Sequence, residues 1–399
     1  MKTMKNSNKL LWYLGYCILF VVCSCKKFVQ VEAPSQLIET NAVFSSDKTA
    51  ISSVTGLYIQ MRNQSLSITN GGVSVFAGLS ADEIINSVPS TLADPFAKNA
   101  LLPSNSTITT GFWTAAYKSI YQTNAILEGV SRSKSLTDSV SGALSGEMKL
   151  VRSFYYFYLT QLFGDVPLIL STDYSVNAAA PRTTTNTIQD QVIADLKDAK
   201  NRLSPNYVSS GRGRPNKWTA SALLARIFLL KKDWVQAEAE ASEVINSGLY
   251  SLSTSLSNVF TGNSNETIWQ LLRDQSNTVE GSVFIPSSGS ARPSYILTSN
   301  LLNSFEAGDE RKTSWIKTNT IGSTPYHYPY KYKMRLSTPV SEYEIVLRLA
   351  ELYLIRAEAR AEQNNLSGAL DDLNIIRARA GLSDYTSTNR DSVLSAIRH

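Results

Sequence analysis

The sequence predicts a mostly α-helical protein, in which tetratricopeptide-like helical hairpins pack against an irregular, loop-rich part with a few short strands. Apolar residues recur at helical spacing along most of the chain, which indicates amphipathic helices. Two long segments share a pattern of helix, short polar turn and helix, with small residues spaced as in tetratricopeptide repeats. The region from Ser251 to Val340 differs, because short apolar runs alternate there with loop-forming residues.

The N-terminus has the order of a secretory signal peptide. Three lysines precede an apolar run from Leu10 to Val22, and the small residue Ser24 stands directly before Cys25. The run is shorter than the about 20 residues that a helix needs to cross a bilayer. The cleavage site resembles the lipobox of bacterial lipoproteins, which are cut before a cysteine that carries a diacylglycerol. We therefore predict that residues 1–24 are removed and that Cys25 carries the lipid.

The three cysteines do not form a cluster in this interpretation. Cys17 and Cys23 fill the apolar segment, and the spacing of Cys23 and Cys25 lacks the second pair or the nearby histidine of a metal site. The sequence also has no Gly-rich phosphate loop and no G-x-S-x-G nucleophile elbow. A net charge of +5, which includes three signal-segment lysines, comes without a basic block. We expect no metal, no cofactor and no nucleic-acid partner.

The first elements after the signal segment are a tether and a helix. A polar, extended tether is predicted from Phe28 to Ser46, where Pro34 disfavours helix. Asp47 is then expected to cap a helix, whose apolar face is Ile51, Val54, Leu57, Tyr58 and Met61. The segment from Asn86 to Thr110 is rich in Ser, Thr, Pro and Asn, which predicts a surface excursion without a regular element.

Three further helices are predicted before the first hairpin. One lies within residues 111–130, and its apolar face is Trp113, Tyr117, Ile120, Tyr121 and Ile126. The next runs through Leu162 and ends at Gly164, with an extended exit through Pro167. The third has an apolar stripe of Ile188, Val192, Leu196, Ala199 and Leu203. Any further tetratricopeptide-like pairs would have to come from these helices.

The hairpin segments are "TASALLARIFLLKKDWVQAEAEASEVINSGLY" and "RLAELYLIRAEARAEQNNLSGALDDLNIIRARAGL". With Ala225 aligned to Ala357, Ala237 aligns to Ala369. This is the tetratricopeptide spacing, in which two antiparallel helices cross closely where side chains are short. Generic hairpins with alanine contacts are the alternative.

The second hairpin departs from the repeat pattern at its charged residues. Arg356 and Arg360 occupy two positions that the repeat usually fills with apolar side chains. Asp371 and Asp372 follow on the next helix, where we expect both to face solvent.

Short strands are expected in the middle region. "NETIWQLL" predicts a strand, and "FIPSSGSARPSYILTSNLLNSF" predicts a loop and then a helix. "YHYPYKYKM" alternates aromatic and polar residues, which fits a strand with one buried face or a loop that exposes its tyrosines. Pro329 favours an edge position.

Taken in order, several segments resemble the SusD/RagB family of nutrient-binding lipoproteins of the Bacteroidetes outer membrane. The segments are "CKKFVQVEAPSQLIETNAVFSSDKTAISSVTGLY", "GLSADEI", "KSIYQTNAILEGV", "GEMKLVRSFYYFYLTQLFGDVPLIL", "ALLARIFLLKKDW", "NLLNSFEAGDERKTSWI" and "VLRLAELYLIRAEARAEQNNLSGALDDLNIIRARAGL". They cover nearly the full length in the order of the family.

The resemblance implies a fold and a function. The fold is a SusD-like α/α superhelix, anchored by its lipid in the outer membrane and displayed at the cell surface. The partners are a SusC-like TonB-dependent transporter and a glycan or peptide nutrient, which the protein captures and hands over without catalysis. Lys26 and Lys27 stand where surface-exported members often have acidic residues, so they leave open which face of the membrane is reached.

The resemblance also implies domain boundaries. We expect a signal peptide at 1–24, a lipid-anchored tether at 25–46, a SusD-like N-terminal helical domain at 47–250 and a RagB/SusD C-terminal domain at 251–399. The last of these is expected to be incomplete, because the sequence ends at "DSVLSAIRH" within an amphipathic helix that the family continues.

Candidate ligand residues are chosen for their chemistry, since the family has no fixed ligand motif. A sugar site needs a flat aromatic ring and fixed polar groups, and the chain contains 19 Tyr, 13 Phe and 6 Trp. For each candidate a core or rim position is the alternative. The predicted residues are Asn86, Asp94, Phe96, Phe284, Tyr295, Trp315, Tyr326 and Tyr328.

Two other functions compete with nutrient capture. A tetratricopeptide lipoprotein could scaffold envelope assembly and bind only protein. A surface hydrolase would need paired carboxylates, and Asp82 and Glu83 are adjacent. Neighbours in sequence rarely face one cleft as glycosidase carboxylates do, so we expect this pair to cap a helix or to form ion pairs.

Replacing the predicted anchor tests the N-terminal interpretation. Cys25→Ser removes the only thiol at the cleavage site that can accept the lipid, so we expect an uncleaved or soluble precursor. Fractionation of membranes from cells that express the variant measures this. Unchanged membrane partition of Cys25→Ser would contradict the lipid anchor.

Overall fold

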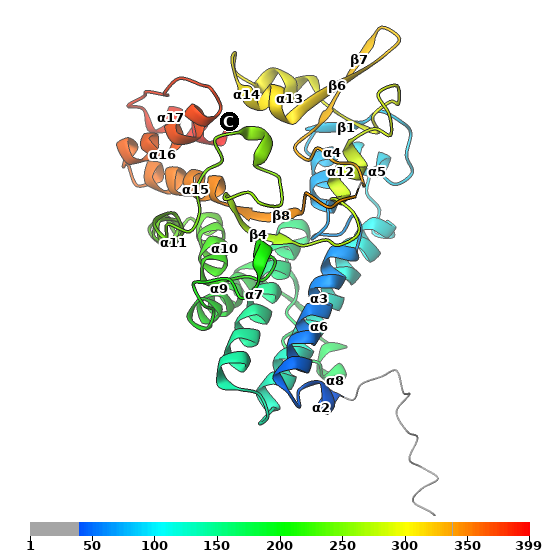
Figure 1. Cartoon of the computed structure of the whole chain (residues 1–399), viewed down its shortest axis with the longest axis vertical. Coiled ribbons are helices and arrows are strands. Elements are labelled where there is room, and N and C mark those ends of the chain that lie inside the picture. The colour runs from blue at the N-terminus through cyan, green and yellow to red at the C-terminus, as the bar shows by residue number, and fades with distance from the viewer. Residues whose placement is uncertain (1–39, 337) are drawn as a thin grey trace, which may run out of the picture. The chain divides into compact units, whose positions relative to one another are not determined.

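A computed structural model of the chain describes residues 40–336 and 338–399. Its contacts divide the chain into two units, Met1–Val43 and Phe44–His399. The described part of the first unit is the short helix α2 (Thr40–Val43), and the predicted anchor and most of the tether lie outside the described residues. The second unit contains the remaining elements (Figure 1). The predicted division of this unit after residue 250 stays a prediction.

Four long helices begin the second unit. They are α3 (Asp47–Asn63), α6 (Ala115–Arg132), α7 (Asp138–Phe163) and α9 (Thr185–Arg202). Each packs against the next in chain order. Ser46, and not Asp47 as predicted, caps α3, because its hydroxyl accepts the Thr49 N–H at 3.3 Å. The Asp47 carboxylate instead accepts the Thr137 N–H at 2.9 Å and so joins α3 to the start of α7.

The patterns of α6, α7 and α9 are borne out with one exception. Helix α7 ends at Gly164, whose φ of 68° is the left-handed conformation that glycine adopts readily. The whole predicted stripe of α9 is buried. On α6, however, Tyr121 is 52% exposed and does not belong to the apolar face.

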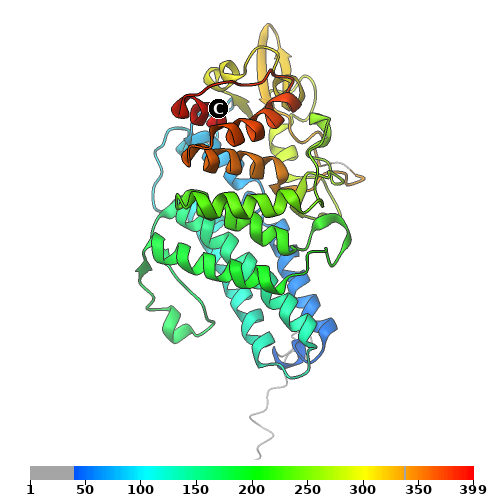
Figure 2. The same ribbon diagram turned by 90° about the vertical axis from the view of Figure 1, so that its left-hand side faces the viewer.

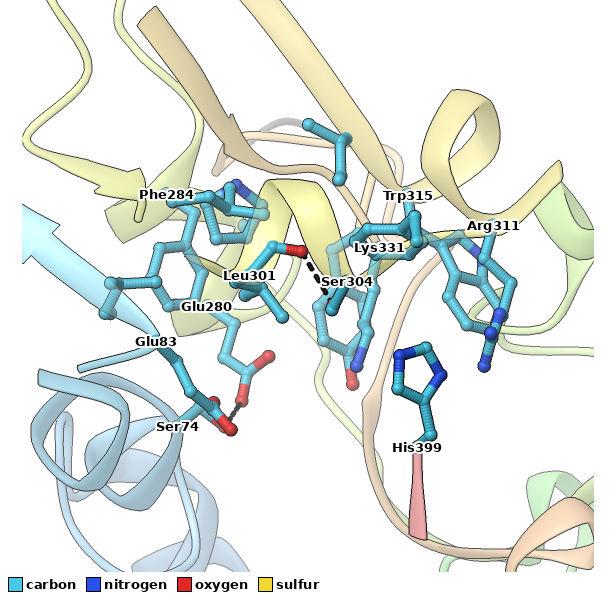
Figure 3. A pocket seen from close by; sticks show the side chains of 17 residues that line it. Ser74, Glu83, Glu280, Phe284, Leu301, Ser304, Arg311, Trp315, Lys331 and His399 are labelled. Carbon is cyan, nitrogen blue, oxygen red and sulfur yellow. Dashed lines mark hydrogen bonds between the residues drawn. The ribbon is translucent and has the colours of Figure 1, made fainter. Parts of the chain in front are cut away.

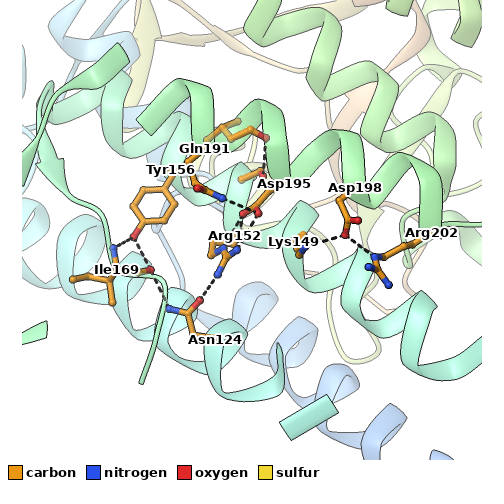
Figure 4. A network of polar contacts seen from close by, with 11 residues as sticks. Asn124, Lys149, Arg152, Tyr156, Ile169, Gln191, Asp195, Asp198 and Arg202 are labelled. Atoms are coloured by element: carbon orange, nitrogen blue, oxygen red, sulfur yellow. Dashed lines mark hydrogen bonds and ion pairs between the residues drawn. The ribbon is translucent and has the colours of Figure 1, made fainter. Parts of the chain in front are cut away.

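A buried ion pair joins α7 to α9 (Figure 4). Arg152 donates to both carboxylate oxygens of Asp195, at 2.8 and 3.0 Å. Its remaining nitrogen donates to Asn124 of α6 at 2.8 Å, and Asn124 in turn donates to the Ile169 carbonyl at 3.0 Å. Because each buried donor has an acceptor, three helices and the chain after α7 are held in one register.

The two predicted hairpins are present and continue the stack. They are α10 (Lys217–Leu230) with α11 (Trp234–Asn246), and α15 (Leu349–Glu362) with α16 (Leu366–Arg379), after which α17 (Arg390–Arg398) packs on α15 and α16. The alanines that predicted close helix crossing are fully buried: Ala225, Ala237, Ala357 and Ala369. Figure 2 shows these helices lying one above another. The predicted helical fold class is therefore confirmed.

The charged residues of the second hairpin form a buried network. Asp372, which was expected to face solvent, is 1% exposed. It accepts hydrogen bonds from Arg356 at 2.6 and 2.8 Å and from Arg360 at 2.9 Å. The two arginines at apolar repeat positions are thus the partners that make burial of Asp372 tolerable.

The loop-rich part contains short helical turns. The α-helices are α4 (Gly78–Ser80), α5 (Asp94–Ala97), α8 (Tyr174–Asn177), α12 (Val279–Phe284), α13 (Ser299–Ser304) and α14 (Glu310–Trp315). The π-helical turns are η2 (Val73–Ala77) and η3 (Thr107–Thr114), and the 3₁₀ turns are η4 (Ser210–Arg212) and η5 (Leu256–Asn258). The predicted excursion from residue 86 to 110 is therefore not free of regular elements, since it contains α5 and the start of η3.

The strands of the described residues form two-stranded antiparallel sheets. The pairs are β1 (Ile84–Asn86) with β5 (Tyr295–Leu297), β2 (Val166–Pro167) with β3 (Arg182–Thr183), β4 (Thr267–Leu271) with β8 (Glu344–Arg348), and β6 (Ile316–Ile321) with β7 (Thr324–Pro329). The strand predicted for "NETIWQLL" is confirmed as β4. In "YHYPYKYKM", where a strand and a loop were both possible, residues 326–329 belong to β7 and residues 330–334 to a loop. In β7 the side chain of Tyr328 is buried, as the alternating pattern indicates.

Glu266 connects the loop-rich part to the helical stack. Its side chain is fully buried just before β4 and receives Arg348 at 2.7 Å and Arg379 of α16 at 2.6 Å. The Glu266 carbonyl also accepts the Leu349 N–H at 2.8 Å. The β4–β8 sheet is therefore held directly against the second hairpin.

Removing the Asp372 carboxylate tests the buried network. Asp372→Ala leaves Arg356 and Arg360 buried without their partner, so we expect the free energy of unfolding to fall by about 3 kcal/mol. Asp371→Ala is the matched control, because its side chain is exposed, and it should change stability by less than about 0.5 kcal/mol. Urea denaturation measures both, and equal effects would contradict the network.

Candidate ligand-binding cavity

A cavity of about 420 Å³ lies in the loop-rich part. Its wall comes from segments far apart in sequence: η2, the start of β1, α12, α13, α14 and the chain after β7. Figure 3 shows the side chains that line it. The volume is within the range of cavities that hold small ligands.

Aromatic residues form part of the wall. They are Phe284, Phe305, Trp315 and Tyr332. The Trp315 indole N–H donates to the Leu256 carbonyl at 2.9 Å, and the ring meets Phe260 edge-on at a centroid distance of 5.6 Å. The indole is thus fixed before any ligand arrives, so a ligand that contacts it does not have to order it.

Carboxylates and a hydroxyl gather at one end of the cavity. The π-helical turn η2 presents Ser74, whose hydroxyl donates to the Glu280 carboxylate of α12. Glu83 lies beside them at the start of β1 (Figure 3). The expected capping or ion pairing of Asp82 and Glu83 is not found among residues 40–336 and 338–399, because no salt bridge there involves either carboxylate. Glu83 faces the cavity instead.

Basic groups lie at the other end. Arg311 of α14 is paired with the buried Asp309, at 2.6 Å from its Nη2 to Oδ2. Lys331 follows β7, and its ammonium lies 5.6 Å from the centroid of the Trp315 ring. Figure 3 shows Lys331, Arg311 and Trp315 apart from the Glu83 and Glu280 group, so the cavity has an acidic end and a basic, aromatic end.

The environment of Lys331 disfavours its charge. Its side chain is exposed at the wall of the cavity, and neighbouring protein groups replace part of the water around the ammonium. This desolvation lowers the pKa of Lys331, and the nearby Arg348 lowers it further. Glu280 and Glu83 act in the opposite direction without reversing the effect.

A pair of buried carboxyls lies at the acidic end. Desolvation raises the pKa of Glu280 and raises that of Glu344 well above its usual range, and the Glu280 charge adds to the effect on Glu344. Glu344 Oε2 receives no N–H or O–H donor from the part of the chain that the structure describes. The raised pKa of Glu344 favours its protonated form in the folded protein. Ser74 donates to Glu280 from the other side.

Two of the predicted ligand residues, Phe284 and Trp315, line the cavity. Tyr295 lies behind the wall, where its ring meets Phe284 edge-on at 6.0 Å. Phe96 is 4% exposed and packs on Phe76 at 4.5 Å, and Tyr328 is 2% exposed. These three rings have core positions in the described structure.

The other predicted residues lie outside the cavity. Asn86 donates to the Asp94 carboxylate, which also accepts the Ser90 N–H at 3.1 Å, so both side chains fix the local loop. Tyr326 is half-buried on the β6–β7 hairpin, with the Arg292 guanidinium 4.8 Å from its ring centroid. The ligand role of all eight residues stays a prediction.

Sequence reasoning missed the polar and charged residues of the cavity: Ser74, Glu83, Glu280, Ser304, Arg311, Lys331 and His399. For Glu83 the sequence predicted helix capping or an ion pair. Lys331 belongs to the alternating stretch that predicts β7, and a polar residue among tyrosines is a signal for a binding surface. Ser74 and Glu280 carry no local signal, because distant segments bring them together.

None of the helices in residues 40–336 and 338–399 is long and apolar enough to cross a membrane. The same residues contain no group of three or more metal-binding side chains.

Comparison with known families identifies the chain. Residues 28–229 match the model of a SusD-like family described as starch-binding and associating with the outer membrane. Residues 300–399 match the model of the SusD family that includes RagB. The chain belongs to the SusD/RagB family.

Relatives in this family span most of the chain. SusD-like protein P25 of Formosa agariphila is 25% identical and aligns with 91% of this chain and 80% of its own length. A SusD-like protein of Bacteroides ovatus is 24% identical and aligns with 72% of this chain and 62% of its own length.

Solved SusD-like structures share the fold. A SusD superfamily protein of Bacteroides vulgatus has a TM-score of 0.77 at 22% identity and covers 88% of this chain and 83% of its own. Surface glycan-binding protein A of Bacteroides uniformis has a TM-score of 0.75 at 19% identity, with coverage of 88% and 84%. At these identities the likeness concerns the SusD/RagB fold.

The buried carboxyl pair predicts a pH dependence of stability. The pKa of Glu344 is raised in the folded state, whereas in the unfolded chain it is about 4.3. Between these two pKa values the folded protein keeps a proton that the unfolded chain has lost. The contribution of Glu344 to stability is therefore present at low pH and falls as the pH rises through this window, by about 1.4 kcal/mol per pH unit.

Glu344→Gln removes this titration. We expect the free energy of unfolding of the variant, relative to wild type, to increase between about pH 4.5 and pH 7. In wild type the unfolded chain releases a proton that the folded protein keeps, so only wild type loses stability over this range. Glu310→Gln changes an exposed glutamate and should give a difference that is independent of pH. Urea denaturation at several pH values measures both, and a constant difference for Glu344→Gln would contradict the raised pKa of Glu344.

Proposed function

We propose that the protein captures a glycan in the cavity between Trp315 and the Glu83 and Glu280 carboxylates, and that it does so without catalysis. The observation that carries this proposal is the juxtaposition of a fixed indole ring with hydrogen-bonding groups that converge from different segments. A sugar ring has an apolar C–H face for the indole and hydroxyl groups for the carboxylates. The cavity volume of about 420 Å³ suits one or two sugar rings.

The relatives support the choice of ligand class. The matching family is described as starch-binding, and structures of the same fold include a SusD-like carbohydrate-binding protein of Bacteroides vulgatus and a surface glycan-binding protein. We carry carbohydrate binding over to this chain because its cavity has the groups that such a ligand needs.

The geometry favours capture over hydrolysis. A glycosidase holds one carboxyl as an acid and another as a nucleophile or base on either side of the scissile bond. In this cavity Glu83 and Glu280 lie at the same end (Figure 3), and Glu280 is already engaged by Ser74. A sugar placed on Trp315 therefore presents its hydroxyls to both carboxylates, and none of residues 40–336 and 338–399 lines the opposite end of the cavity with a carboxyl side chain.

The location and the protein partner are part of the proposal. A lipid on Cys25 would hold the protein at the outer membrane, in line with the family description, at the cell surface. There it would pass the captured glycan to a SusC-like TonB-dependent transporter. The domains expected from the sequence, at 47–250 and 251–399, would both contribute to the ligand site, because Ser74 and Glu83 of the first and Glu280 and Trp315 of the second line one cavity.

Truncating the indole tests the site. Trp315→Ala should weaken binding of an oligosaccharide by tenfold or more, which corresponds to about 1.4 kcal/mol of lost contact. Tyr174→Ala is the control, because Tyr174 is 83% exposed on α8 and does not line the cavity. Isothermal titration calorimetry against a panel of oligosaccharides measures the affinities.

A second variant separates loss of contact from loss of fold. Trp315 also packs on Phe260, whereas Glu83 has an exposed side chain, so Glu83→Gln should weaken binding without lowering the melting temperature. Unchanged affinity in both variants would contradict the site. Failure of every oligosaccharide to bind, with a barrel protein co-purifying, would favour a protein-binding scaffold.

A further inference from the structure

The basic side chains that line the cavity are Arg311, Lys331 and His399, and the contacts of Lys331 differ from those of Arg311 and of the nearby Lys333 and Arg348. Arg311 is paired with Asp309, and Lys333 donates to the carbonyls of Ser314 and Tyr330. Arg348 is paired with Glu266. For the Lys331 ammonium, by contrast, residues 40–336 and 338–399 supply no carboxylate within ion-pair distance and no hydrogen-bond acceptor.

The Lys331 ammonium is an available donor at the wall of the cavity. Its side chain is exposed, its three N–H donors have no acceptor among residues 40–336 and 338–399, and partial desolvation lowers its pKa. A ligand in the cavity can therefore supply the acceptors that the protein does not. The contact with the Trp315 and Phe260 rings, at 5.6 and 5.7 Å, orients the ammonium but accepts no hydrogen bond.

From this arrangement we infer that the cavity selects a glycan with an anionic substituent, a carboxylate or a sulfate, which the Lys331 ammonium binds. This inference rests on the proposed function, because it names the class of glycan that the same cavity takes. The sugar ring lies on Trp315, its charged group meets Lys331, and its hydroxyls point to Glu83 and Glu280.

The two ends of the cavity explain why the charged group faces Lys331. Glu83 and Glu280 repel an anion, so it is confined to the end with Lys331 and Arg311 (Figure 3). Glu280 already accepts a hydrogen bond from the Ser74 hydroxyl, and its carboxylate has further lone pairs that can accept from a sugar hydroxyl. The polarity of the cavity therefore fixes one orientation of an acidic sugar.

The test compares acidic and neutral sugars of equal length. The probes are oligogalacturonides, sulfated oligogalactans and uncharged oligogalactans, titrated by calorimetry into the wild-type protein. We expect at least one acidic series to bind tenfold or more tightly than the uncharged series, with an advantage that decreases as salt is added. The series that binds distinguishes carboxylate from sulfate.

Variants of Lys331 test whether this residue causes the preference for acidic sugars. Lys331→Gln should remove the tenfold advantage and leave the affinity for the uncharged sugar within about twofold, because hydroxyl contacts remain. Lys331→Arg should keep the advantage. Lys48→Gln removes the same charge from an exposed position on α3 and should leave both affinities unchanged.

The outcomes separate this inference from the proposed function. If uncharged sugars bind as tightly as acidic ones, or if Lys331→Gln keeps the preference, the inference is wrong while glycan capture stands. If no sugar of any series binds the folded protein, both the inference and the proposed glycan capture are wrong. Melting temperatures of the variants establish that each one is folded.

Discussion

The structure depends on the buried carboxylate of Glu266. This side chain has no exposed surface and is engaged by two arginines, one at the end of β8 and one on α16. A buried charge is stable only when it is fully paired, so the three residues fix the β4–β8 sheet against the second hairpin. Trp269 of β4 is also fully buried and meets Phe154 of α7 edge-on at 5.5 Å. The sheet is thus held by the early helices as well as by the late ones.

The cavity follows from the position of this sheet. The chain leaves β4 toward α12, which carries Glu280, and it enters β8 soon after Lys331 and Tyr332. Glu344, the first residue of β8, lies opposite Leu271 of β4, and the Glu280 charge contributes to its raised pKa. At Gly281 a side chain would meet the Met334 carbonyl at 2.3 Å, so glycine allows α12 to approach this segment closely. The chain segments next to the β4–β8 pair therefore bring Glu280 and Lys331 to the cavity, whereas η2, β1 and α14 supply the rest of its two ends.

Local signals in the sequence predicted much of the framework. The alanine spacing that predicted the hairpins works because short side chains are required wherever helices cross closely, and Gly164 ended α7 because of its own backbone freedom. Asp372 was misjudged, because its partners Arg356 and Arg360 are on another helix and only the folded hairpin brings them together. The same holds for Glu83, Glu280 and Lys331, since no pattern within a segment encodes a contact between segments. Trp315 could be selected because tryptophan is a suitable sugar contact on chemical grounds alone.

The central claim is that a glycan binds between Trp315 and the Glu83 and Glu280 carboxylates. A crystal structure of the protein grown with an oligosaccharide that binds it in solution tests this claim most directly. The account predicts a sugar ring in contact with the Trp315 indole, with its hydroxyls hydrogen-bonded to the two carboxylates. A sugar bound elsewhere, with the cavity filled by water alone, would contradict it.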